Sequence, residues 1–156
     1  MQGMIGHHAQ AIEMTALLYT RTNRADMKLL AERIDVSQAD EIKMMKQWLE
    51  ARGLEIPSEH AHHMGGPLMP GMLTAEQMTK LAAAKGDEFD RLFLEAMIFH
   101  HEGALTMVAK LIATPGAAQG GEIYDFASHV DTDQKMEISR MTALLKTIKG
   151  RTEGQP

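Results

Sequence analysis

The sequence predicts an all-α protein: a four-helix bundle made of two duplicated helical hairpins, with a short extra helix in the crossover between them. Apolar residues recur at helical spacing along most of the 156 residues, and no alternating segment of useful length appears. Met4–Met14 repeats as Met97–Met107 with six identities in eleven positions, and Gln38–Met45 matches Gln134–Met141. Because each hairpin alone would expose an apolar stripe, we expect the two to pack around a pseudo-twofold axis.

The first hairpin is expected within residues 1–53. Its first helix starts at Met4 and ends near Thr22, and Asp26 is expected to cap the second helix. Gly53 suits the position just past the end of that helix, and Pro57 supports the stop.

The crossover is expected over residues 54–86 and the second hairpin over residues 87–150. The run Thr74-Ala75-Glu76-Gln77 has capping-box spacing, which predicts a short helix that Gly86 closes. Further helices are expected from Asp87 to the break at 114–116, and from about residue 120 to Gly150. One domain thus covers residues 1–150, and residues 151–156 are expected to form a disordered tail.

Composition excludes several classes of function. Lys and Arg number 16 against 21 Asp and Glu, a net charge of −5 without a basic run, so nucleic-acid binding is not expected. No apolar stretch approaches the roughly 20 residues of a membrane span. The absence of cysteine excludes disulfides, thiolate metal sites and cysteine nucleophiles, whereas 14 Met and 8 His are present.

Each repeat carries a pair of adjacent histidines with methionines at helical spacing. Met4 precedes His7 and His8 by three and four residues, and Met97 stands in the same relation to His100 and His101. Met14 and Met107 follow the first histidine of each pair by seven residues. We expect His7 and His100 to stay partly accessible in a groove, whereas His8 and His101, at the centre of their apolar stripes, would be buried.

The partner helices place polar residues inside their apolar stripes. Gln38 and Gln134 fall in mid-stripe with Glu41 and Glu137 beside them, and could hydrogen-bond the central histidines or orient a ligand imidazole. The alternative interpretation is a structural layer of buried histidines satisfied by hydrogen bonds. Met45 and Met141 lie further along the same stripes and are interior candidates for metal ligation.

The crossover is rich in histidine and methionine, and we interpret it as a mobile capture loop, with a solvated His-rich linker as the alternative. Thioether and imidazole together suit Cu(I), and by the same softness Ag(I). The candidate metal ligands are Met4, His7, His8, Met14, Met97, His100, His101, Met107, Met45 and Met141 in the helices, with His62, His63, Met64, Met69 and Met72 in the loop.

The leading hypothesis is a non-enzymatic protein that binds Cu(I) and buffers it or passes it on. Two alternatives stay open: a redox or electron-carrier bundle with iron or haem, and a structural envelope domain with a buried His-Gln layer. Glu-x-x-His, the spacing of di-iron bundles, occurs only from Glu59 to His62 in the loop. The metal ion is the expected partner, and the sequence leaves a copper-transfer partner and self-association open.

These motifs resemble the domain-of-unknown-function family numbered 305, over nearly the whole chain. The resemblance rests on the repeated Met-Ile-x-His-His-x-x-Ala, on Gln-x-x-Glu-Ile-x-x-Met, and on Pro-Gly-Met at 70–72 followed by Phe-Asp-Arg-Leu-Phe-Leu at 89–94. It implies a ferritin-like bundle, copper binding or copper tolerance without established catalysis, and a periplasmic or extracellular location. By the repeat, the first helix begins in mid-element, so we expect an upstream segment with an export signal.

Overall fold

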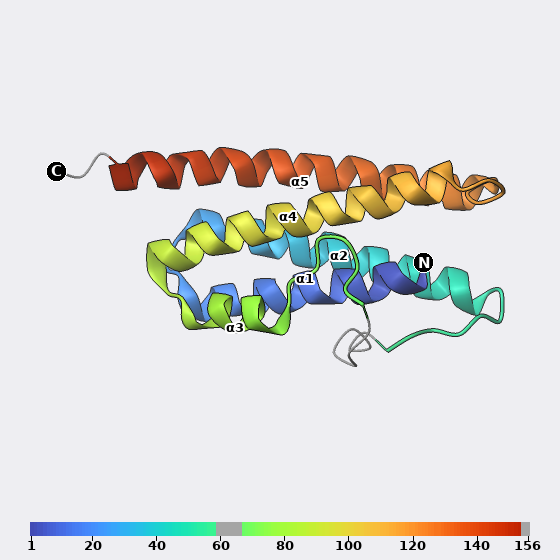
Figure 1. Ribbon diagram of the computed structural model, residues 1–156, viewed down its shortest axis with the longest axis horizontal. Coiled ribbons are helices and arrows are strands. Elements are labelled where there is room, and N and C mark those ends of the chain that lie inside the picture. The colour runs from blue at the N-terminus through green and yellow to red at the C-terminus, as the bar shows by residue number, and fades with distance from the viewer. Residues whose placement is uncertain (59–66, 154–156) are drawn as a thin grey trace.

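The computed structural model describes residues 1–58 and 67–153, and within them it contains five helices and no strand. Four of the helices are long and one is short (Figure 1). They are α1 (Gln2–Arg21), α2 (Ala25–Glu50), α3 (Ala75–Ala83), α4 (Gly86–Ala113) and α5 (Gly121–Glu153). None of these helices combines the length and hydrophobicity that a transmembrane span requires.

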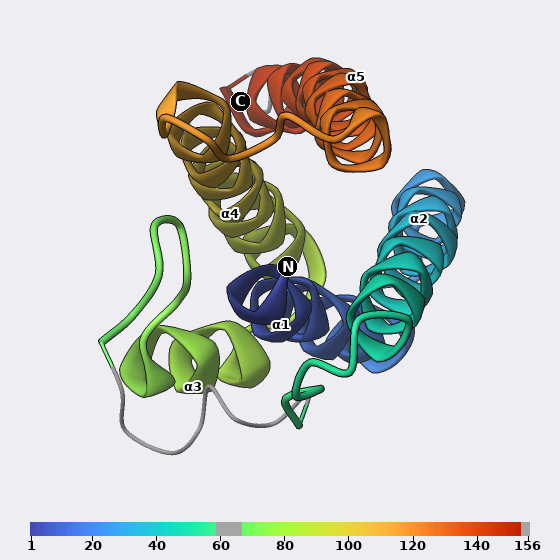
Figure 2. The same ribbon diagram turned by 90° about the vertical axis from the view of Figure 1, so that its right-hand side faces the viewer.

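The four long helices form the predicted bundle of two hairpins. α1 packs along α2 and α4 packs along α5, and the hairpins meet where α1 contacts α4 and α2 contacts α5. α1 and α4 run in opposite directions (Figure 1), and α3 lies outside the bundle beside both of them (Figure 2). The predicted fold class, including the short helix in the crossover, is therefore confirmed.

Two predicted helix boundaries are wrong. α2 begins at Ala25 with Arg24 at the N-cap, so Asp26 lies in the first turn and does not cap the helix. Its carboxylate instead pairs with the Arg24 guanidinium at 2.6 Å. α5 continues through Gly150 to Glu153, because one glycine costs a helix only about 1 kcal/mol. Residues 151–153 of the expected tail are thus helical, and residues 154–156 lie outside the described part of the chain.

Two other helix ends match their sequence signals. The capping box forms, since Thr74 Oγ1 accepts from the Gln77 N–H at 3.1 Å and Gln77 Oε1 accepts from the Thr74 N–H at 2.8 Å. Gly53 adopts a φ of +61°, the left-handed conformation that ends α2.

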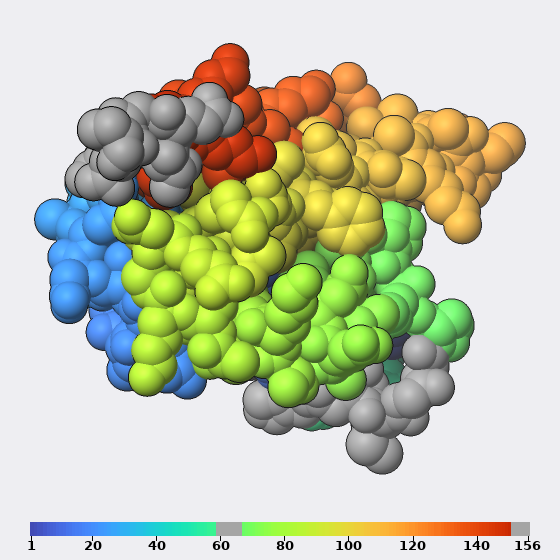
Figure 3. Space-filling view, turned by 60° about the vertical axis from the view of Figure 1, so that its left-hand side comes forward, coloured from blue at the N-terminus to red at the C-terminus, as the bar shows by residue number. Residues whose placement is uncertain are grey.

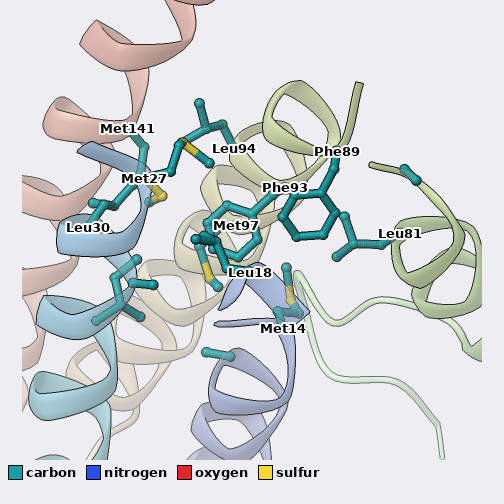
Figure 4. Packing of buried hydrophobic residues seen from close by; sticks show 14 of the residues in the cluster. Met14, Leu18, Met27, Leu30, Leu81, Phe89, Phe93, Leu94, Met97 and Met141 are labelled. Atoms are coloured by element: carbon teal, nitrogen blue, oxygen red, sulfur yellow. The ribbon is translucent and has the colours of Figure 1, made fainter. Parts of the chain in front are cut away.

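The bundle interior consists of two hydrophobic clusters. The larger one contains both buried phenylalanines, Phe89 and Phe93, together with Leu18, Met97 and Met141 (Figure 4). The smaller one is built around aliphatic residues and methionines, namely Met4, Ile5, Ile42, Met45, Leu49, Ala104, Val108, Ala127 and Val130.

Between the clusters lie buried polar residues of all four long helices, and we call the two histidines of α1 and of α4 and the Gln and Glu of α2 and of α5 the polar layer. Along α1 the layer falls between Ile5 and Ala11, and it interrupts the other three helices in the same way. Its members are His7 and His8 on α1, Gln38 and Glu41 on α2, His100 and His101 on α4, and Gln134 and Glu137 on α5.

The crossover segment, residues 67–74, is anchored on both central helices. The Gln10 amide on α1 donates to the Leu73 carbonyl at 2.9 Å, and its oxygen accepts from the Leu73 N–H at 2.8 Å. On α4 the Pro70-Gly71 turn packs backbone to backbone, because a Cβ on Gly103 would lie 2.0 Å from the Pro70 oxygen. The crossover and α3 thus form a continuous surface with α4 (Figure 3).

This anchoring breaks the internal symmetry. Gln10 and Gly103 are equivalent positions of the repeat, since 10 + 93 = 103, yet both hold the same crossover segment. The crossover therefore covers only one face of the duplicated bundle, the face formed by α1 and α4.

We expect Gly103→Ala to destabilise the protein by about 1–3 kcal/mol, because its Cβ would collide with backbone atoms. A loss of stability would be informative, because replacing a helical glycine by alanine normally stabilises the helix by up to about 1 kcal/mol. Gly150→Ala in α5 is the matched control, as nothing lies within 4 Å of a Cβ there. Urea unfolding measures the free energy of unfolding of both variants. A Gly103→Ala protein as stable as the parent would contradict the backbone contact.

Candidate metal centre

The centre of the polar layer is a stacked pair of histidines, one from each hairpin. His7 of α1 and His100 of α4 have ring centroids 3.9 Å apart and ring planes inclined by 38°. Both side chains have 0% exposure. The expectation that they stay partly accessible in a groove is therefore wrong, because the direct packing of α1 on α4 and the crossover turn cover them.

The second histidine of each pair bonds a glutamate of its own hairpin. His8 Nε2 lies 2.5 Å from Glu41 Oε2, and His101 Nε2 lies 2.5 Å from Glu137 Oε2. The partners are the glutamates rather than Gln38 or Gln134. The two halves agree closely, since the rings of His7 and His8 lie 6.2 Å apart and those of His100 and His101 lie 6.3 Å apart.

Burial keeps His7, His8 and His100 neutral. Desolvation, with smaller effects from neighbouring histidines, lowers the pKa of His7 and of His8 to about 3, and it lowers the pKa of His100 well below the usual 6.5. Desolvation raises the pKa of Glu41 to about 8, and the carboxylates of Asp133 and Glu137 contribute to the rise. Neutral imidazole is the form that binds metal ions, so no proton has to leave these rings first.

One hydrogen bond fixes the tautomer of His7. Its Nε2 lies 2.9 Å from the Pro70 carbonyl oxygen, which can only accept, so Nε2 carries the hydrogen. In a neutral ring Nδ1 then presents a lone pair, and this atom is buried without a partner among the described residues. His100 has no such partner at either ring nitrogen. The donor set at this point suits a metal ion that accepts imidazole.

Methionines line a cavity of about 420 Å³, which we call the methionine cavity. Four thioethers line it, those of Met1, Met4, Met69 and Met107. Gly3 provides the room, because a Cβ there would lie 3.0 Å from the sulfur of Met69 and 3.8 Å from the terminal methyl of Met107. Residues far apart in the chain thus place soft donors around one space.

The crossover connects the cavity with the histidines. Pro70 lines the methionine cavity and also accepts the hydrogen bond from His7. Met69 lines a second cavity of about 390 Å³ as well, together with Met72. The part of the predicted capture loop that the structure describes therefore lies against the bundle.

The other candidate methionines lie elsewhere. Met14, Met97 and Met141 are fully buried in the larger hydrophobic cluster (Figure 4), and Met45 is fully buried in the smaller one. They fill the core as methionine commonly does. His62, His63 and Met64 lie outside the described residues.

Two residues of this region, Met1 and Pro70, are not among the predicted ligands. Met1 precedes Met4 by one helical turn, and that spacing could have indicated its role. Pro70 acts through its carbonyl, for which the sequence offers no signal.

The pKa shifts predict that acid destabilises the fold through the histidines. Unfolded histidine titrates near 6.5, whereas His7 and His8 have a pKa of about 3 in the folded protein. Below pH 6.5 the unfolded chain therefore binds protons that the folded protein does not, at a cost of about 1.4 kcal/mol per pH unit for each proton. Their contribution falls as the pH drops from about 6.5 towards 3.

Glu41 acts in the opposite direction. Its pKa rises from 4.5 to about 8 on folding, so its contribution is present below pH 4.5 and is lost as the pH rises towards 8. Urea unfolding from about pH 4 to pH 8 should show the histidine slope on the acid side. Glu41→Gln should remove the decline between pH 4.5 and 8 while the acid slope remains. A stability independent of pH would contradict both assignments.

Comparisons with known proteins agree with this architecture. The sequence profile of the family described as "Domain of unknown function (DUF305)" matches residues 1–153. A DUF305 protein from Streptomyces coelicolor, described as secreted, is 29% identical with a TM-score of 0.82, over 95% of this chain and 90% of that chain. A DUF305 fragment from Deinococcus radiodurans is 27% identical with a TM-score of 0.79, over 94% and 92%.

A third similar structure contains copper. CopM in its Cu(I)-bound form is 26% identical with a TM-score of 0.70, over 94% of this chain and 95% of that chain. Comparison with curated protein sequences gives no match. The profile match over residues 1–153, together with the shared fold, shows that this chain belongs to the DUF305 family.

Proposed function

We propose that this protein binds Cu(I), and by the same softness Ag(I), outside the cytoplasm, and that it buffers the ion or passes it to a partner. The observation that carries the proposal is the methionine cavity, in which Met1, Met4, Met69 and Met107 line one space together with Pro70, the hydrogen-bond partner of the buried His7. Cu(I) is a soft ion that thioether and imidazole ligands favour.

The rest of the cavity wall supports a soft ion over a hard one. Val108, Leu111, Phe126 and Val130 are apolar, Thr106, Lys110 and Thr114 complete the lining, and none of its described residues is an aspartate or a glutamate. Mg²⁺ and Ca²⁺ require several oxygen ligands, which this wall does not supply. Thioethers also have no proton to lose, so binding would persist in acid.

His7 would support the cavity from behind. By donating to the Pro70 carbonyl it holds the turn that carries Met69, and its own Nδ1 is buried without a hydrogen-bond partner among the described residues. The stacked His7 and His100 offer imidazole donors to an ion that passes the thioethers.

The copper-bound structures of CopM support copper as the ion, and the secreted Streptomyces coelicolor relative supports the location. The proposal is for binding without catalysis.

Replacing the cavity methionines should remove Cu(I) binding while the fold remains. In Met4→Leu/Met69→Leu/Met107→Leu the thioethers are lost at nearly constant volume, so we expect the affinity to fall by about ten- to hundredfold or more. The matched control is Met14→Leu/Met97→Leu/Met141→Leu, in the larger cluster, which should bind Cu(I) as the parent does. Anaerobic titration against a chromophoric Cu(I) chelator measures both.

Retained binding in the cavity variant would overturn the proposal. If deletion of residues 60–66 alone abolished binding, the loop would be the site.

The two kinds of histidine should respond differently. His8→Ala/His101→Ala leaves two buried glutamates without partners, so we expect a loss of about 1–3 kcal/mol of stability for each, with Cu(I) stoichiometry retained. His7→Ala/His100→Ala should weaken Cu(I) binding, because the imidazole donors and the support of Pro70 are lost. Thermal unfolding and Cu(I) titration of both variants test this, and the reverse pattern would contradict it.

A further inference from the structure

A separate cluster of potential ligands lies between α2 and α5, and we call it the seam cluster. It consists of Glu41 from α2 with His129 and Asp133 from α5, and one ligand atom from each lies within 4.8 Å of the others. His129 Nε2 is already 3.2 Å from Asp133 Oδ2, one helical turn away. None of the methionines lining the methionine cavity borders the cavity around this cluster.

Glu41 gives the cluster a buried oxygen atom that has no hydrogen-bond partner among the described residues. The residue is 1% exposed, and while its Oε2 bonds His8, its Oε1 has no partner among the described residues. A buried carboxylate oxygen without a partner is costly, so a ligand for it is expected. Glu41 also lines a cavity of about 490 Å³ together with His129 and Asp133.

The surroundings of the cavity favour a cation. Four carboxylates line it, namely those of Glu32, Asp40, Glu41 and Asp133, while Arg33 is the one Arg or Lys in the described lining. The His129 side chain is 57% exposed and the Asp133 side chain 24%, so an ion from solvent can reach them and both can adjust their rotamers.

The repeat shows that the bundle itself does not require this cluster. The equivalents of His129 and Asp133 are Arg33 and Ser37, since 129 − 96 = 33 and 133 − 96 = 37. The buried His–Glu pairs occur in both halves, as an architectural feature should, whereas the imidazole and carboxylate of the seam cluster occur in one half only.

We propose that Glu41, His129 and Asp133 form a second metal site, which binds a divalent transition-metal ion such as Zn(II). One imidazole and two carboxylates are a donor set of borderline hardness, unlike the thioethers of the methionine cavity. Ligand bonds of about 2.0–2.2 Å place neighbouring donor atoms roughly 3.3 Å apart in a tetrahedral site. The His129–Asp133 pair fits this spacing, and the ligand atom of Glu41 lies within 4.8 Å of both, so rotation of the two partly exposed side chains would close the site on Glu41. Water would complete the coordination.

The test measures Zn(II) binding by calorimetry, and Co(II) binding by its visible spectrum, in a chain that carries His60→Ala, His62→Ala and His63→Ala. This background removes the loop imidazoles, and we expect it to bind one Zn(II). His129→Ala and Asp133→Asn should each lower the affinity at least about tenfold and abolish the Co(II) absorption. Asp131→Asn is the matched control, because Asp131 pairs with Lys135 on the same helix. This variant should bind Zn(II) with the affinity of the parent chain.

Zn(II) binding unchanged by His129→Ala and Asp133→Asn would overturn the proposal. Both residues are partly exposed, so their replacement should leave the fold intact, and circular dichroism checks this. Met4→Leu/Met69→Leu/Met107→Leu should bind Zn(II) normally. Because that variant lacks the cavity thioethers, failure of the Cu(I) proposal and failure of this one are distinguishable.

Discussion

Two buried hydrogen bonds, His8 to Glu41 and His101 to Glu137, set the register of the bundle. Each joins the two helices of one hairpin at the level where the hydrophobic core is interrupted. Sliding either helix by one turn would leave a histidine and a glutamate buried and unpaired, which costs far more than the hydrogen bond contributes. With both pairs in register, the two hairpins meet with His7 of α1 against His100 of α4.

The crossover converts this symmetric scaffold into an asymmetric one. Gln10 satisfies both polar groups of the Leu73 backbone, and Gly103 admits the Pro70-Gly71 turn. Because a chain of two hairpins has only one long connection, only one face of the bundle receives it. Within the described residues, the methionine cavity therefore has no counterpart in the other half of the repeat. The second hairpin instead places different residues, His129 and Asp133, where α5 meets α2.

Much of the fold could be predicted because its signals are local and repeated. Helical periodicity, the capping box at Thr74 and the duplicated histidine pairs are all visible in the sequence. The choice of Glu41 over Gln38 as the partner of His8 could not be predicted, because these residues are one turn apart and only the axial register of α1 on α2 decides between them. The burial of His7 depends on how the hairpins meet and where Pro70 rests, which are tertiary contacts. The seam cluster joins positions 41 and 129, and no local pattern connects them.

The anchoring of the crossover also has a kinetic consequence. Lifting residues 69–73 from α1 and α4 would break the Gln10 and His7 hydrogen bonds together and uncover this side of the stacked imidazoles. Such an opening is a local unfolding event with its own free energy, well below that of the whole bundle. Exchange at the histidines would therefore be governed by the opening rate of one short segment. If Cu(I) binds as proposed, an ion at the histidines would be released slowly, whereas an ion at the surface would exchange rapidly.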